Sequence, residues 1–316
     1  MAKKKPIPQI VKDIRAFKPN PPNWAQQKII SYSQLSMYTE CPKKWSLQYK
    51  EGHKQFTSTI HTVFGTALHE VLQHYLDVMY EVSGAEADRI EIYDMFQEKL
   101  REEYTTQYKK NNNQHFSTPQ ELRQFFEEGK EIIRDFSKNK GKYFSKKGWH
   151  LVGCEIPVQI SPVPSKPHVI FNGFLDVVMY HELTDTIKII DIKTSRQGWN
   201  KSQKQDELKQ FQLILYKKFL SDLFDIDPKK IEIEYFIVKR QVYEHEDYVI
   251  KRIQTFSPPS GKIKIKKSTD TLYKFISEAF DQNHGYKEVD LQPTPNDKCK
   301  WCPFHKTHLC SATFTK

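Results

Sequence analysis

Three charged residues stand inside two segments that otherwise have the composition of buried strands. Asp176 lies in "FLDVVMY", and Asp191 and Lys193 lie in "IKIIDIKT". A lone charge in a buried strand is costly unless it is paired or binds a metal ion. Two carboxylates beside a backbone carbonyl suit Mg²⁺ or Mn²⁺, and a neighbouring lysine can orient a water or balance the charge of a phosphate. A buried Asp–Lys ion pair at a sheet edge is the alternative that the same residues allow.

The spacing of these three residues allows them to converge. Asp191 and Lys193 are two residues apart, so their side chains project from the same face of a strand. The short connection "HELTD" makes the strand of Asp176 the expected hairpin partner of that strand. We therefore expect the three side chains to meet at one site.

Two further motifs lie on predicted helices. His69 shares a helix edge with Gly65 and Leu72, where a core or capping histidine is the usual interpretation. Gln212 and Tyr216 are four residues apart, so they lie on one face of the helix that follows the Asp-x-Lys strand. Each motif alone is common, and the order of the motifs along the chain carries more information.

That order is similar to the order in a known family. Along the chain the motifs are His69, Asp176, Asp191-Ile192-Lys193 and Gln212-x-x-x-Tyr216. They resemble, motif by motif, the RecB-like branch of the PD-(D/E)XK nuclease superfamily, over roughly Ser31 to Cys310. The resemblance implies an α/β fold with a restriction-endonuclease-like core of helix, three-strand meander, helix and strand, in which helices flank a mixed sheet. It also implies a deoxyribonuclease that depends on Mg²⁺ or Mn²⁺.

The resemblance implies a role for each matching residue. Asp176 and Asp191 would ligate the catalytic metal ion together with the backbone carbonyl of Ile192. Lys193 would position or activate the attacking water. His69 matches the family histidine that completes the metal site.

Two positions beyond the metal site also have counterparts in the family. Gln212 and Tyr216 match the motif that holds the nucleic-acid strand near the scissile phosphate. Glu155 falls where many relatives carry an acidic residue. Because Glu155 alternates with the apolar face of its strand, a solvated strand residue is an equal alternative.

Four cysteines form a second constellation. "CKWCPFHKTHLC" holds Cys299, Cys302 and Cys310, and Cys41 lies far upstream in "YTECPKKW". Four thiolates can close a [4Fe–4S] cluster or a tetrahedral zinc site. A metal that joins segments so far apart would offset a large loop-closure entropy, so we expect a structural clasp.

The cysteine arrangement resembles that of the iron–sulfur AddB-type and CRISPR-adaptation nucleases, which carry one cysteine before the nuclease core and three after it. The spacing departs from that pattern, because the seven residues between Cys302 and Cys310 exceed the usual number. His305 or His308 is therefore an alternative ligand, in a zinc site with three cysteines. Cys154 lies on an apolar strand face and is expected to be a core residue.

Hydrophobic periodicity predicts the helices that carry these residues. Residues 62–82 and 206–224 have the 3.6-residue pattern of amphipathic helices, and a helical insertion is expected at about 85–147. Ser33 is the predicted N-cap of a short helix that ends at Pro42.

The pattern changes to alternation after Gly148, which is typical of strands. It predicts a three-strand meander followed, after the second long helix, by a strand at residues 230–240. In the first strand, alternation places Val152, Cys154 and Ile156 on one face.

The length, composition and net charge of the chain limit its possible domain organisation and partners. A chain of 316 residues with 38% apolar residues can bury one large core or two small ones. We expect a basic, Pro-rich arm at residues 1–30 and a single nuclease domain at 31–316, with its cysteine cluster at 299–310. The net charge of +10 favours a polyanion such as DNA as partner, although a merely basic surface would give the same charge.

The sequence also bears on location. No apolar run reaches the length of a membrane span, and the first residues lack the apolar stretch of a signal peptide. Five cysteines argue against a disulfide framework. We expect a cytoplasmic protein, in the host cytoplasm if the chain is viral.

These observations predict a metal-dependent DNA nuclease, acting as an exonuclease on DNA ends or single strands in recombination, repair or replication. One alternative is an inactive nucleic-acid-binding module of nuclease fold, and another is a metal-clasped scaffold that recruits a helicase or recombinase. "SGKIK" lacks the preceding glycine and the Ser/Thr of a P-loop, so any helicase motor would be a separate protein. The basic stretches at 238–256 and 261–267 either follow a phosphate backbone or form a solvated strand and loop.

Overall fold

The computed structural model describes residues 7–53, 56, 58–243, 251–282 and 284–312. The chain divides into two compact units. Unit 1 comprises residues 1–17, 57–156 and 174–260, and unit 2 comprises residues 18–56, 157–173 and 261–316. Among the described residues, no helix is long and apolar enough to cross a membrane.

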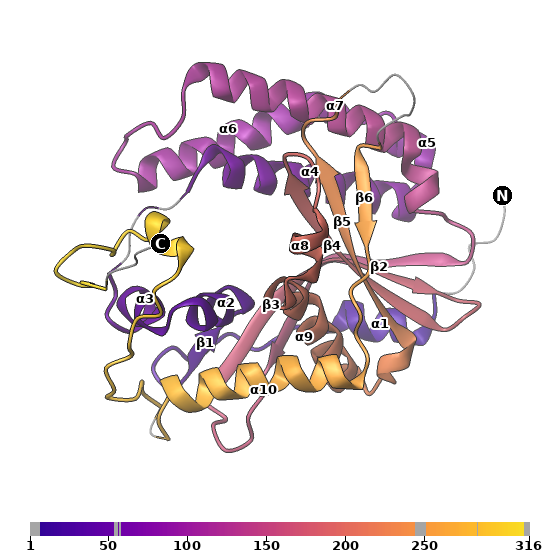
Figure 1. The fold of residues 1–316 in the computed structure, drawn as a ribbon. Helices are drawn as coiled ribbons and strands as arrows, with labels where there is room; N and C mark the ends of the chain where they lie inside the picture. The colour runs from indigo at the N-terminus through magenta and orange to yellow at the C-terminus, as the bar shows by residue number, and fades with distance from the viewer. Residues whose placement is uncertain (1–6, 54–55, 57, 244–250, 283, 313–316) are drawn as a thin grey trace. The chain divides into compact units, whose positions relative to one another are not determined.

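A mixed sheet carries the strands in the order β1–β3–β4–β5–β6, and β2 pairs with β3 (Figure 1). β3 is antiparallel to β4, β4 is parallel to β5, and β5 is antiparallel to β6. β1 runs parallel to the first residues of β3 in unit 2. The strand bounds are β1 Lys28–Ile30, β2 Trp149–Ile160, β3 Val169–His181, β4 Thr186–Ser195, β5 Ile231–Lys239 and β6 Ile253–Phe256.

Four helices of unit 1 pack on one face of its strands (Figure 1). They are α4 Ile60–Glu81, α5 Gly84–Ala87, α6 Ile92–Lys110 and α7 Pro119–Tyr143. Ile190 and Ile192 of β4 join the hydrophobic core beneath these helices. Because side chains alternate along a strand, Asp191 and Lys193 project from the opposite face.

The opposite face of these strands is covered by the connection from β4 to β5. This connection contains α8 Lys201–Gln205, α9 Glu207–Phe224 and the short 3-10 turn η2 Pro228–Lys230. The Tyr235 hydroxyl of β5 donates to the backbone oxygen of Lys209 in α9. A helical crossover is the usual way to join two parallel neighbours. Helices on both faces of a mixed sheet confirm the predicted α/β fold.

Unit 2 is built around aromatic side chains. Its helical elements are α2 Tyr32–Glu40, α3 Pro42–Trp45, the π-helical turn η1 Ser46–Lys50, α10 Lys262–Ala279 and η3 Asp297–Trp301. Trp45 is fully buried and packs edge-on against Phe275 and Phe280, with ring centroids 5.2 and 5.7 Å away. The buried Lys166 ammonium donates to the backbone oxygens of Ile276 and Phe280, which satisfies carbonyls at the end of α10.

The structure differs from the sequence prediction near the N-terminus. The stretch predicted as an arm contains α1 Gln9–Ala16, in which Val11 and Ile14 are buried because their three-residue spacing places them on one helix face. Arg15 donates to the backbone oxygens of Leu151 and Val152 in β2. Part of the predicted arm therefore packs within unit 1.

Two other local predictions need correction. Ser31, and not Ser33, caps α2, because the Ser31 hydroxyl accepts from the backbone N–H of Gln34. The stretch 261–267 is neither strand nor loop but opens α10 at Lys262. Residues 244–250 of the other basic stretch lie outside the described residues.

Candidate active site

The three charged strand residues lie where the pairing of β3 with β4 ends. The ladder runs from the pair His181–Thr186 to the pair Val177–Ile190, and Asp176 and Asp191 are the next residues of the two strands. Residues that follow a cross-strand pair in step project from the same face. The hairpin therefore brings the two carboxylates together, as the sequence predicts.

Asp191 is buried, with 1% of its surface exposed. Its Oδ2 lies 2.7 Å from the Lys193 ammonium, and among the described residues no further hydrogen-bond partner of either carboxylate oxygen is seen. Burial raises the pKa of Asp191 to about 6, although the charge of Lys193 opposes this shift. A buried carboxylate with a single cationic partner keeps lone pairs that a divalent cation can accept.

Asp176 faces the same space from β3. Its Oδ2 accepts from the backbone N–H of Ile192 at 2.8 Å and lies 3.6 Å from Nδ1 of His69 on α4. Burial raises the pKa of Asp176 to about 6, against the charge of Lys193 and this backbone hydrogen bond. The structure therefore brings Asp176, Asp191, Lys193 and His69 into one cluster.

His69 and Lys193 differ in their protonation states. Burial lowers the pKa of His69, and the charge of Lys193 lowers it further, so the imidazole is neutral at pH 7 and keeps a lone pair for a metal ion. Burial alone would lower the pKa of Lys193, but the charges of Asp191 and Asp176 raise it above its ordinary value. Lys193 is therefore a cation that can stabilise negative charge.

The donor set fits a hard divalent cation. Two carboxylates and a neutral imidazole are ligands that Mg²⁺ or Mn²⁺ accepts, and the Asp191 oxygens have no other well-aligned partner in the described chain. As the side chains stand, no group of three or more His, Cys, Asp or Glu residues among those described is arranged to hold a metal ion.

We expect the metal-free protein to bind Mn²⁺ more weakly as the pH falls below about 6, because the pKa values of Asp176 and Asp191 are raised to about 6. A raised pKa keeps each carboxyl group protonated up to that pH, so a proton must leave before the metal ion can bind. Each such proton lowers the affinity by about tenfold per pH unit below the pKa. Calorimetric titration with Mn²⁺ at acidic and neutral pH measures this, and equal affinities would contradict it.

Gln73 was not identified by the sequence analysis, and it touches both sides of the site. One turn after His69 on α4, its Nε2 donates to Oε1 of Glu155 at 2.6 Å and to the backbone oxygen of Asp176 at 3.0 Å. Glu155 has a left-handed φ of 51°, which interrupts the alternation of side chains along β2. Earlier in the same strand, the neighbouring residues Leu151 and Val152 are both buried, so alternation fails there as well. The four-residue spacing of His69 and Gln73 is the signal that could have identified it.

Cys154 is the fifth cysteine, predicted to be a core residue. It packs against the hydrophobic core beneath α4, and its thiol lies 3.8 Å from the backbone oxygen of Gln73. Burial raises the pKa of this thiol. Because a protonated thiol is a poor metal ligand, these contacts agree with a packing role.

The helix motif lies on α9. Burial raises the pKa of Tyr216, a side-chain hydrogen bond with Gln212 lowers it, and the negative charges of Asp191 and Asp176 raise it again. The Tyr216 hydroxyl is therefore protonated and is sensitive to the charges of the catalytic cluster. Gln212 is partly exposed, whereas Tyr216 is 6% exposed.

Removing the Tyr216 hydroxyl should affect cleavage and not folding. We expect Tyr216→Phe to lower the cleavage rate by about tenfold or more, since one hydrogen bond near the reacting phosphate is lost, with little change in the melting temperature. Leu215→Ala is the matched control on the same helix, and it should cost about 2–5 kcal/mol of stability because Leu215 is fully buried. Rate assays with thermal melts compare them, and equal destabilisation would show that Tyr216 serves only the core.

The comparison with known proteins agrees with this geometry. A family model described as "PD-(D/E)XK nuclease superfamily" matches residues 29–307. The chain belongs to this superfamily. A crystal structure of the protein named "Putative exonuclease" from Eubacterium rectale superposes with a TM-score of 0.50 at 11% sequence identity, covering 95% of this chain and 97% of that chain. This likeness shows the fold alone, and no curated protein matches the chain.

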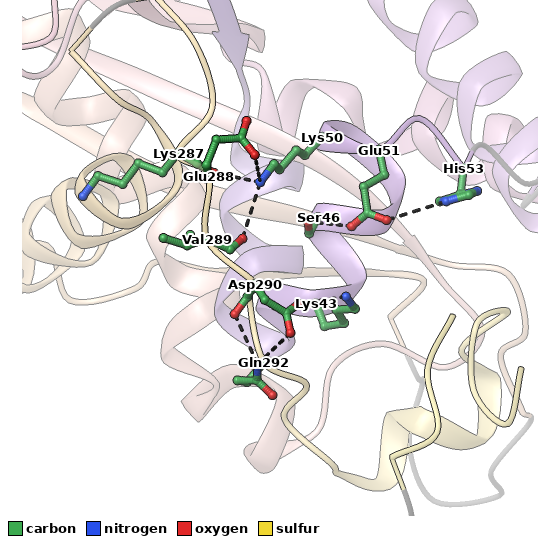
Figure 2. Close-up of polar contacts among 10 residues, drawn as sticks. All are labelled: Lys43, Ser46, Lys50, Glu51, His53, Lys287, Glu288, Val289, Asp290 and Gln292. Carbon is green, nitrogen blue, oxygen red and sulfur yellow. Dashed lines mark hydrogen bonds and ion pairs between the residues drawn. The ribbon is translucent and has the colours of Figure 1, made fainter. Parts of the chain in front are cut away.

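The four cysteines of the predicted metal clasp all lie in unit 2. Figure 2 shows Lys50, in the helical turns that follow Cys41, in contact with three residues that precede the C-terminal cysteines: Lys287, Glu288 and Val289. Lys50 donates to the backbone oxygen of Lys287 at 2.7 Å, and Lys43 pairs with Asp290 at 3.0 Å. Polar contacts therefore join the segment that precedes Cys299 to the helical turns that follow Cys41.

The contacts continue next to the cysteines themselves. Asn296 Nδ2 donates to the backbone oxygen of Glu40, the neighbour of Cys41, at 3.3 Å, and Lys298 pairs with the Glu40 carboxylate. All four cysteines are free and partly buried. Their thiolate chemistry suits iron or zinc, but the described side chains do not converge into a metal-binding group.

The two histidines near these cysteines differ in surroundings. Nε2 of His305 is buried and has no hydrogen-bond partner among the described residues, whereas His308 is exposed. An unpartnered buried imidazole nitrogen is a suitable zinc ligand. Of the two alternative ligands, the structure favours His305.

Proposed function

We propose that the protein is a metal-dependent DNA nuclease that hydrolyses phosphodiester bonds, and that it acts as an exonuclease. The observation that carries this proposal is the convergence of two buried carboxylates, Asp176 and Asp191, on the Lys193 ammonium. A core ion pair needs only one carboxylate, whereas two buried carboxylates side by side repel each other unless a further cation lies between them. Membership of the PD-(D/E)XK nuclease superfamily independently supports a phosphodiester hydrolase.

The proposed roles follow from charge and position. Asp176, Asp191 and the backbone carbonyl of Ile192 would hold the cation, with His69 at its side. A bound Mg²⁺ or Mn²⁺ would supply Lewis-acid activation and neutralise charge on the phosphate. Lys193 is cationic, so we assign it to orienting the attacking water and balancing charge rather than to removing a proton.

The strand would be held from α9. The Tyr216 hydroxyl stays protonated, so it can donate a hydrogen bond to a phosphate oxygen next to the site, with Gln212 beside it. Such contacts fix the register of a strand without reading its sequence. This agrees with a nuclease that degrades DNA of any sequence.

The finer classification rests on the sequence motifs. We propose that the chain belongs to the RecB-like branch, resembling the AddB-type and CRISPR-adaptation nucleases, and works in recombination, repair or replication alongside a separate helicase or recombinase. We further propose that Cys41, Cys299, Cys302 and Cys310 hold a structural [4Fe–4S] cluster, with zinc bound by three cysteines and His305 as the alternative.

Digestion of matched substrates tests the exonuclease assignment. An exonuclease should degrade linear single- or double-stranded DNA labelled at either end and leave circular DNA of the same sequence intact. Release of label from one end before the other gives the polarity. Cleavage of the circle at the rate of the linear form would make the enzyme an endonuclease, and preference for RNA of the same sequence would contradict a DNA substrate.

A further inference from the structure

The strand register of unit 1 extends the catalytic face toward the ends of β4 and β5. Parallel pairing sets Asp191 opposite Tyr235, Lys193 opposite Ile237 and Ser195 opposite Lys239. Paired residues project from the same face, so Lys239 shares the face of the two catalytic residues. Two residues along one strand and one strand across place the Lys239 Cα about 8 Å from that of Lys193.

The turn that follows β4 carries further residues to this place. The Ser195 hydroxyl donates to the backbone oxygen of Gly198, and Gln254 of β6 bonds both the N–H and the carbonyl of Trp199. Gly198 has a φ of 94°, and a Cβ there would lie 2.9 Å from the Lys239 side chain. The turn is therefore fixed against Lys239, and α8 begins directly after it.

Lysines gather over the aromatic rings of this turn and the adjoining strands. The Lys204 ammonium of α8 lies 5.9 Å from the Phe256 ring centroid, and the Lys209 ammonium of α9 lies 5.5 Å from that of Trp199. An aromatic ring attracts an ammonium without neutralising its charge. Among the described residues, no carboxylate lies within ion-pair distance of Lys204, Lys209 or Lys239, and the nearby Asp206 carboxylate caps α9 through the N–H of Lys209.

These positive charges repel one another. Burial lowers the pKa of Lys239, and the charge of Lys204 lowers it further. Like charges held close together without acidic partners favour the binding of a polyanion. Beside them lies an open surface hollow of about 740 Å³, lined by residues of α8, including Lys201, and by Asp206.

We propose that Lys204, Lys209 and Lys239 form a phosphate-binding surface that holds the backbone of the DNA strand as it enters the catalytic site. This inference rests on the proposed nuclease function for its ligand. The lysines contact phosphates rather than bases, so binding is independent of sequence and strongly dependent on salt.

The test is binding of a fluorescent single-stranded DNA oligonucleotide to the full chain in EDTA, where nothing is cleaved. The double variant Lys204→Met/Lys239→Met should weaken binding by about tenfold or more and should reduce the slope of log K against log salt by about 1.4, at 0.7 per lost phosphate contact. Lys109→Met/Lys110→Met, an equal charge change on exposed residues of α6, is the control and should leave the slope unchanged.

Unchanged affinity and slope in the first variant, or an equal loss in the control, would overturn the proposal. The nuclease assignment is tested separately by cleavage with Mg²⁺ or Mn²⁺. A wild-type protein that binds DNA through these lysines but cuts none refutes the nuclease function and supports the binding surface. If the wild-type protein cuts DNA but the double variant binds the oligonucleotide normally, the nuclease function is supported and the binding surface is refuted.

Discussion

Asp191→Ala and Lys193→Ala should each lower DNA cleavage by about a thousand-fold or more, while the protein stays folded. Asp191→Ala removes a metal ligand, and Lys193→Ala removes the cation that balances charge at the phosphate. The protein should still fold because neither substitution leaves a buried charge without a partner. Lys193 is partly exposed and reaches water, and Asp191, with a pKa already near 6, becomes protonated. Single-turnover rates with matched thermal melts measure both effects.

The control for this experiment lies on the same strand. Lys188 of β4 pairs with Glu234 of β5 at 2.9 Å, on the face opposite Asp191 and Lys193. Lys188→Ala removes an equal charge from β4 and should cost at most about 1 kcal/mol of stability without affecting the cleavage rate. Near-normal turnover in Asp191→Ala or Lys193→Ala would refute the assignment of the active site.

Cys41→Ser and Cys302→Ser should each remove the metal clasp of unit 2 and lower the melting temperature by similar amounts. The free energy of binding a structural metal is also folding free energy, about 10 kcal/mol or more for structural zinc. Protein prepared without oxygen should be brown and contain iron and sulfide if a [4Fe–4S] cluster is bound, and colourless with zinc if His305 completes the site. Metal analysis, visible absorbance and thermal melts measure these outcomes.

Cys154→Ser is the matched control, because Cys154 packs against the core of unit 1 and contacts no other cysteine among the described residues. Its metal content should equal that of the wild type. Anaerobically purified protein with neither iron nor zinc, and with four freely titrating thiols in unit 2, would refute the clasp. The polar contacts of Lys43 and Lys50 would then be what joins these segments.

Side chains along a strand alternate with a period of two residues, and this made much of the candidate active site predictable. Asp191 and Lys193 share a face because they are two residues apart, and a tight hairpin fixes Asp176 opposite Asp191. The helix period likewise placed Gln212 and Tyr216 together on α9. These relations depend on local geometry, which a sequence specifies directly.

Relations that depend on tertiary contacts were not predictable in the same way. The link from Gln73 to Glu155 and Asp176 spans strands far apart in the chain, and Glu155 adopts a left-handed φ that alternation does not foresee. The helical state of Lys204 and its position near Lys239 depend on how the turn at Gly198 packs. A run of basic residues gives no information on which lysines share a surface.

The most direct measurement is cleavage of end-labelled linear DNA by the purified wild-type protein with Mg²⁺, with Mn²⁺ and with EDTA, beside Lys193→Ala prepared in the same way. We expect rapid loss of label with either metal ion, none with EDTA, and none with Lys193→Ala. Cleavage that persists in EDTA, or that is equal in wild type and variant, would contradict this expectation.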